Sequence, residues 1–212
     1  AALKMFTDRV KVVGVFASTD VTRKVVNRVA HAGGLLIATD GRQMAVIPAG
    51  ESTTDVRQFN SQTGEQVKFE VDDKGAKSDL AQYPNWRQVL PSDPEWRAKA
   101  DVAVLLKMVR GAMQLWVGEE RKSSSKPMQL FLDSDGNFGV KAIVPDSGEF
   151  ESGVTEKSKI IGAFNADYLA DGLEAAARMG NQSLWVATDE GLLGPASFLG
   201  TDFAYVLMPM RV

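Results

Sequence analysis

The chain of 212 residues contains no cysteine, a single histidine and no long apolar run. Without cysteine it can form no disulfide, no thiolate metal site and no cysteine nucleophile, a composition that fits a reducing compartment. His31 lies in a predicted strand–turn segment, where a lone histidine is more often structural than catalytic. No run reaches the roughly 18 apolar residues that suggest a membrane span, and no signal-peptide pattern is visible. We therefore expect a cytoplasmic protein without membrane association.

Motifs that carry catalysis or bind metals are also missing. The turn Asp133-Ser134-Asp135-Gly136 lacks the third acidic position and the distal glutamate of a calcium loop, and a hairpin turn explains it better. Gly191-Leu192-Leu193-Gly194 is followed by no Lys-Ser/Thr pair and therefore does not read as a phosphate-binding loop. No spacing singles out a carboxylate pair for acid–base work. The sequence predicts neither an enzyme nor a metal or cofactor site.

The net charge of −3 is unevenly distributed along the chain. Residues 1–48 carry seven Lys/Arg and three Asp/Glu, whereas residues 101–212 carry ten basic and fifteen acidic residues. An acidic chain with a basic segment can still contact DNA through one face. The alternative interpretation is a chance asymmetry of solvated charge.

The second half of the sequence predicts two amphipathic helices among short strands. Asp101 to Val117 places its apolar residues on one helical face, and a second helix begins after Asn165, a good N-cap, and ends at Gly180. The predicted strands cover residues 128–132, 138–144, 150–155, 159–164, 184–187, 192–198 and 203–208. This order is a β-α-β-β-β unit repeated twice within residues 97–212, after a proline-bracketed linker at 91–96.

The first half, residues 1–90, is less regular. We predict a short strand over residues 2–6, a helix over 7–18 and a polar loop over 49–64. Further strands are expected over residues 23–32, 35–38, 43–47 and 67–71.

Four segments of the chain carry a family resemblance. They are the C-terminal Ala204-Tyr205-Val206-Leu207-Met208-Pro209-Met210-Arg211-Val212, Phe164-Asn165-Ala166-Asp167-Tyr168-Leu169, Tyr83-Pro84-Asn85-Trp86-Arg87-Gln88-Val89-Leu90-Pro91, and Ala38-Thr39-Asp40-Gly41-Arg42-Gln43-Met44-Ala45-Val46. These segments resemble the bacterial DNA polymerase III β subunit, the sliding-clamp family, and occur in the family's order. The resemblance implies an α+β protein with the DNA-clamp fold, built of duplicated β-α-β-β-β units with helices on one face of antiparallel sheets. It matches a shortened second clamp domain (1–90) and a complete third one (97–212), and the family's first domain is absent.

The resemblance also implies a pocket for clamp-binding peptides of polymerases and repair proteins. An apolar groove walled by methionine suits a short extended peptide with one or two apolar anchors. The family's basic residue at the position of Gln88 is replaced here by an amide. The matching positions are Thr39, Gly41, Arg42, Gln43, Met44, Pro84, Gln88, Val89, Val206, Met208, Pro209, Met210 and Arg211. The alternative is that Val206 and Met208 are core residues of a final strand.

Contact with duplex DNA is the second implied property, because clamps line their hole with basic helices that contact phosphates without reading bases. The candidates are Arg9, Lys11, Lys99, Lys107 and Arg110, with the last three expected on or beside the helix of residues 101–117. The alternative is an ordinary solvated helix face. The helix after Asn165 is acidic and predicts a poor surface for DNA.

These features leave two functions open. The first is a processivity clamp in which three two-domain chains supply the six domains of a closed ring around DNA. The second is a non-ring clamp homologue that binds clamp-interacting peptides as a regulator or decoy of replication. A bacterial, phage or mobile-element origin fits both, and an enzyme on the same scaffold would need a catalytic pair that the sequence does not offer.

Overall fold

A computed structural model of the chain describes residues 2–23, 25–67, 83–90, 96–116, 125–145, 147–188 and 194–211. The chain divides into two compact units. The first comprises Ala1–Leu90 with Asp202–Tyr205, and the second comprises Pro91–Thr201 with Val206–Val212. Each unit is described by itself.

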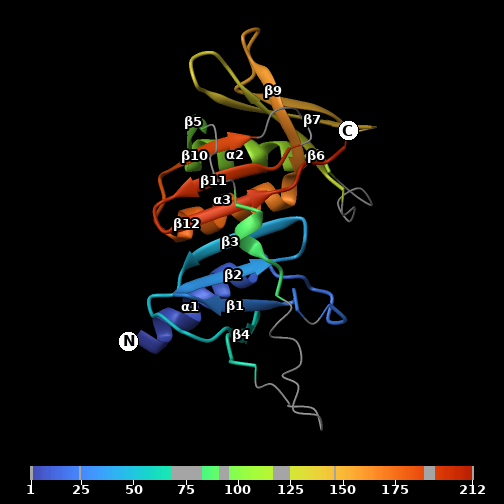
Figure 1. Cartoon of the computed structure of the whole chain (residues 1–212). Coiled ribbons are helices and arrows are strands. Elements are labelled where there is room, and N and C mark those ends of the chain that lie inside the picture. The colour runs from blue at the N-terminus through green and yellow to red at the C-terminus, as the bar shows by residue number, and fades with distance from the viewer. Residues whose placement is uncertain are drawn as a thin grey trace. The chain divides into compact units, whose positions relative to one another are not determined.

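The first unit is an antiparallel sheet with one helix against its face (Figure 1). The sheet has the strand order β4-β1-β2-β3. Its elements are α1 (Ala2–Gly14), β1 (Arg28–Ala32), β2 (Leu35–Thr39), β3 (Gln43–Pro48), β4 (Arg57–Asn60) and the 3₁₀ helix η2 (Trp86–Gln88). Phe6, Val10 and Val13 recur at helical spacing and are buried, which explains why α1 packs on this sheet.

Four predictions for this unit are wrong. Residues 2–6 are helical, because Phe6 belongs to the same apolar stripe as Val10 rather than to a strand. The helix ends at Gly14 and not at residue 18. The strand β1 begins only at Arg28, because residues 25–27 form a turn. The segment 49–64 is not entirely loop, because β4 pairs with β1 through Phe59 opposite Val29.

The second unit contains the predicted duplication. The first copy is β5 (Trp96–Asp101), α2 (Val102–Met113), β6 (Pro127–Leu132), β7 (Phe138–Val144) and β8 (Gly148–Ser152). The second copy is β9 (Lys159–Asn165), α3 (Ala166–Arg178), β10 (Ser183–Thr188), β11 (Ala196–Gly200) and β12 (Phe203–Leu207), whose residues Phe203–Tyr205 belong to the first unit. Together with the antiparallel pairing, this confirms the expected fold class.

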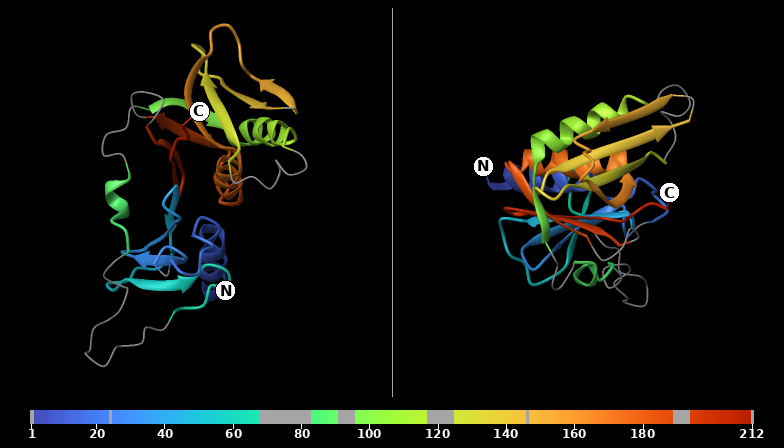
Figure 2. Two further views of the ribbon diagram at one scale, coloured as in Figure 1. Left: turned by 90° about the vertical axis from the view of Figure 1, so that its right-hand side faces the viewer. Right: turned by 90° about the horizontal axis from the view of Figure 1, so that it is seen from above.

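The core of the second unit lies between two antiparallel sheets and the paired helices. One sheet has the order β8-β7-β6-β9, and in the other β10 pairs with both β11 and β5. The helices α2 and α3 lie side by side (Figure 2). Leu105 and Leu169 are among the largest fully buried side chains of these helices.

The predicted order implies a strand before the helix of residues 101–117, but the sequence prediction gives it no residue range. Residues 97–100 alternate between exposed Arg97 and Lys99 and buried Ala98 and Ala100, which is the pattern of a half-buried strand. Lys99 therefore lies on a strand and not on the helix with Lys107 and Arg110.

The remaining expectations lie partly outside the described residues. The strand predicted over 67–71 falls there from residue 68 onward, and the strand predicted over 192–198 falls there at residues 192 and 193. In the described part of the chain, no helix is both long and apolar enough to cross a bilayer.

Candidate functional site

The turn between β2 and β3 is held by its own side chains. The Thr39 hydroxyl donates to the Gln43 carbonyl oxygen at 2.7 Å and accepts from the Gly41 N–H at 3.0 Å. The Asp40 carboxylate accepts from the backbone N–H groups of Arg42 and Gln43, at 2.8 and 3.0 Å. Gly41 has a φ of +91°, which favours glycine. This fixed turn presents the exposed side chain of Arg42 to solvent.

Three of the candidate pocket residues point into the first unit instead of outward. Thr39, Gln43 and Met44 are buried. The Gln43 Oε1 accepts from the Tyr205 hydroxyl at 2.9 Å, and its Nε2 donates to Asp40 at 3.2 Å. These residues are therefore placed to support the turn and its strand.

The segment around η2 carries a second group of candidates. The Tyr83 hydroxyl donates to the Ile37 carbonyl oxygen at 3.1 Å, and burial raises the Tyr83 pKa, so that the phenol remains a donor. Trp86 is buried, with the Arg87 guanidinium 4.4 Å from its ring centroid. The segment is thus attached to β2 while Pro84, Gln88 and Val89 remain exposed, and 42% of Val89 is accessible.

The C-terminal tail belongs to the second unit from Val206 onward. Val206 is buried, whereas 43% of Met208 is accessible and Arg211 is exposed. The Met210 N–H donates to the Ala163 carbonyl oxygen of β9 at 2.7 Å, which holds the half-buried Pro209 and Met210 against that strand. Of the two residues that could have been core residues of the final strand, Val206 is one and Met208 is not.

The two basic candidates of α1, Arg9 and Lys11, differ in their solvent exposure. The Arg9 Nη1 donates to the Pro48 carbonyl oxygen at 2.8 Å, and this side chain is half-buried. Lys11 is exposed. Of the two, Lys11 has the side chain better placed to meet an external phosphate.

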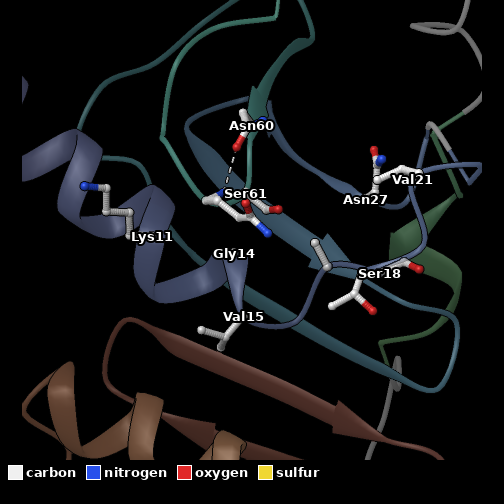
Figure 3. Close-up of a pocket in the computed structure, with 11 residues that line it drawn as sticks. Lys11, Gly14, Val15, Ser18, Val21, Asn27, Asn60 and Ser61 are labelled. Atoms are coloured by element: carbon white, nitrogen blue, oxygen red, sulfur yellow. Dashed lines mark hydrogen bonds between the residues drawn. The ribbon is translucent and has the colours of Figure 1, made fainter.

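A cavity of about 430 Å³ lies at the C-terminal end of α1 (Figure 3). It is lined by Lys11, Gly14, Val15, Ala17, Ser18, Thr19, Val21, Asn27, Asn60, Ser61 and Gln62. The Asn60 Oδ1 accepts from the Gln62 N–H at 2.9 Å, and the Ser18 hydroxyl accepts from the Asp20 N–H at 3.2 Å. Among the described residues that line the cavity, Lys11 alone is charged, so the lining offers no acid–base pair.

The basic residues of α2 face an acidic neighbour. Lys107 and Arg110 are exposed, and the Arg110 Nη2 lies 2.6 Å from Glu174 Oε1 of α3. This ion pair partly neutralises the surface that the sequence predicts to meet DNA.

The exposed face of α3 carries three carboxylates, of which two are paired with cations. Asp167 lies 2.7 Å from the Lys126 Nζ, and Glu174 pairs with Arg110. For Asp171, desolvation by the surrounding protein atoms, followed by repulsion from Glu174 and Asp167, raises the pKa to about 6, although the side chain retains an exposed surface. The acidic character of this helix is confirmed by its surface.

Among the described residues, no three His, Asp or Glu side chains are grouped as a metal site. His31 is fully buried and contacts Phe6 and Phe59, with Nε2 3.2 Å from the Glu51 carbonyl oxygen. It is a core residue of the first unit.

Comparison with solved structures places this fold among sliding clamps. The DNA polymerase sliding clamp from Bacillus subtilis matches 99% of this chain with a TM-score of 0.69 and 12% identity, and 63% of that protein is covered. The DNA polymerase III β subunit from Borrelia burgdorferi matches 98% of this chain with a TM-score of 0.71 and 12% identity, and 62% of it is covered. The β subunit from Pseudomonas aeruginosa matches 100% of this chain with a TM-score of 0.68 and 18% identity, and 65% of it is covered.

Sequence comparison adds no relative. No protein-family model and no curated protein sequence matches the chain. The chain spans less than two thirds of the length of each of these three clamps. It has the fold of DNA polymerase III β subunits.

Proposed function

We propose that the chain acts as a sliding-clamp-like protein that tethers replication proteins to DNA through a peptide-binding site. The observation that carries the proposal is the clamp fold itself, matched over 98–100% of the chain in three solved β subunits or sliding clamps. In this mechanism the protein encircles duplex DNA, slides on phosphate contacts and holds a polymerase by a short peptide segment. Three copies of the two-unit chain supply the six domains of the ring.

The proposed peptide contacts lie on the β2–β3 turn and the η2 segment in the first unit and, separately, on the C-terminal tail in the second unit. The exposed apolar residues among them are Val89 and Met208, and the exposed basic residues are Arg42 and Arg211. Apolar side chains of this kind suit the anchor residues of an extended peptide, and guanidinium groups suit its carbonyl or carboxylate oxygens. Gln43, Met44 and Val206 are buried, so we assign them a supporting role and not contact with the peptide.

The test is the binding of a fluorescently labelled clamp-binding peptide of a DNA polymerase, followed by anisotropy. Met208→Ala should weaken binding by about tenfold or more, since it removes an exposed anchor contact, and adding Met210→Ala should abolish binding. Met5→Ala removes an equally exposed methionine from α1 and serves as the matched control. Unchanged affinity in both tail variants, with an intact fold, would exclude the tail from the site.

A second function is favoured by the surface of α3. Its carboxylates Asp167, Asp171 and Glu174 suit a DNA-facing surface poorly, although Asp167 and Glu174 each pair with a cation. The alternative is a non-ring clamp homologue that binds the same peptides as a regulator or decoy. Light scattering after size exclusion separates the two, because a stable trimer supports the ring and a monomer at all concentrations supports the decoy.

A further inference from the structure

The central strand β10 of the second unit carries a large aromatic side chain in solvent. Trp185 is 48% accessible, whereas its neighbours Leu184 and Val186 are buried. Because side chains alternate across a strand, Trp185 lies on the sheet face opposite to those core residues. Burying an indole contributes much to stability, so its exposure needs a reason outside the core of this unit.

The strands on either side of β10 place an apolar and a basic residue next to this indole. Leu199 of β11 lies directly opposite Trp185 and is 41% accessible. Lys99 of β5 lies directly opposite on the other side and is exposed. Directly opposed residues have their Cβ atoms about 4.5–5.5 Å apart, so the ammonium group can reach whatever covers the indole.

Two further charged residues of β5, Arg97 and Asp101, lie near Lys99. Arg97 lies two residues before Lys99 on β5 and is exposed, at the point where the pairing of β5 with β10 shifts register. Asp101 ends the strand, but its carboxylate accepts from the Val104 N–H at 2.8 Å as the cap of α2. The indole is thus bordered by cations on its β5 side.

We propose that this face binds single-stranded nucleic acid, with one base stacked on Trp185 and the adjoining phosphates held by Lys99 and Arg97. Aromatic side chains beside a positively charged track are the general means by which proteins hold single strands without reading their sequence. The proposal does not depend on the peptide site, because it uses none of its residues.

An acidic peptide would match the same charge, but the sheet favours the nucleic acid. The strand β10 is paired on both sides, by β5 and by β11, and therefore offers no free backbone edge for an added peptide strand. A base needs only the π-face of the indole and a cation for its phosphate.

The experiment titrates the whole chain with an oligothymidylate of about 12 nucleotides and follows tryptophan fluorescence together with the anisotropy of the labelled oligonucleotide. Trp185→Ala should remove the stacking quench and weaken binding by about 5- to 150-fold, the range expected for one stacked base. Trp185→Tyr retains an aromatic ring and should restore most of the affinity. Lys99→Ala should weaken binding and reduce the salt slope by about 0.7, since it removes one phosphate contact.

The matched controls come from the same unit. Ile143→Ala removes an apolar side chain of β7 that is 57% accessible, and Lys157→Ala removes an exposed lysine from a turn. Both should bind the oligonucleotide like the unmodified chain.

Three outcomes would overturn the proposal. The first is equal affinity and equal quenching in Trp185→Ala and the unmodified chain. The second is binding of a duplex of the same length that depends on Trp185 as strongly as binding of the single strand. The third is a peptide of alternating Glu and Leu that binds this face more tightly than the oligonucleotide.

Discussion

The helices α2 and α3 occupy equivalent places in the two halves of the second unit, yet they expose opposite charges. Each begins at a capping side chain, Asp101 for α2 and Asn165 for α3. Each buries a leucine stripe in the same core. On the exposed side, α2 presents Lys107 and Arg110, whereas α3 presents Asp167, Asp171 and Glu174.

This difference shows that the rules that make a helix and the charges that give it a function are independent. Capping and the apolar stripe fix where each helix begins and how it packs. The outward positions remain free to take either sign of charge, and the two helices use that freedom to form an ion pair between Arg110 and Glu174. The fold therefore tolerates an acidic helix in a place where the proposed clamp function favours a basic one.

The largest effect is expected from shortening the buried leucine of each helix. Leu105→Ala in α2 and Leu169→Ala in α3 should each lower the free energy of unfolding by about 2–5 kcal/mol, since both leave a cavity in a packed core. Urea titration followed by circular dichroism measures both variants. If only one of the two variants lowered the free energy of unfolding, the two halves would not share one core.

The caps should contribute less than the core. Asn165→Ala removes the acceptor for the N–H groups of Asp167 and Tyr168, at 2.9 and 3.4 Å, and should cost about 1–2 kcal/mol. Asp101→Ala removes the acceptor for the Val104 N–H at 2.8 Å and should cost about 1 kcal/mol because this cap is exposed. Thermal unfolding of the two variants compares them, and Asn or Ser at position 101 should restore the stability of α2.

Asp171 should make the stability of α3 depend on pH. Its pKa is raised to about 6 in the folded chain, above the ordinary value, so folding disfavours the ionised carboxylate. The contribution of Asp171 to the free energy of unfolding is therefore most favourable below about pH 4, falls as the pH rises towards about 6, and is constant above that.

Asp171→Asn removes this penalty and should stabilise the chain at pH 7 by less than about 1 kcal/mol, because solvent screens the exposed side chain. At pH 4 the variant and the parent chain should unfold at nearly the same temperature. A gain of the same size at both pH values would show that the carboxylate is not the cause.

The ion pair between the helices should have the smallest effect. A double-mutant cycle with Arg110→Ala and Glu174→Ala should give a coupling free energy of about 0.2–1 kcal/mol at low salt, because the arginine side chain is largely exposed. At about 1 M salt the coupling should vanish through screening. A coupling that survives high salt would indicate a desolvated pair and a more rigid helix interface.

Local patterns determined much of the second unit from the sequence alone. The apolar spacing of residues 101–117, the Asn165 cap and the glycine at position 180 act within a few residues of themselves, so they predict both helices and the duplicated order. The resemblance to the clamp family, and not these local patterns, placed the C-terminal tail in the candidate site, and it could not say which of the tail's side chains are exposed.

The tertiary structure decided what depends on distant partners. The polar segment of β4 becomes a strand because it pairs with β1, and the N-terminal residues join α1 because Phe6 packs between His31 and Phe59. Pairing with β10 turns residues 96–101 into a strand, and this moves Lys99 from a predicted helix face to the side of Trp185.

The difference between what the sequence predicts and what only the tertiary structure decides has one physical reason. Helix periodicity, caps and turns depend on residues close in sequence, which the sequence displays directly. Strand pairing, the burial of Val206 beside the exposure of Met208, and the pairing of Arg110 with Glu174 depend on residues that only the folded chain brings together.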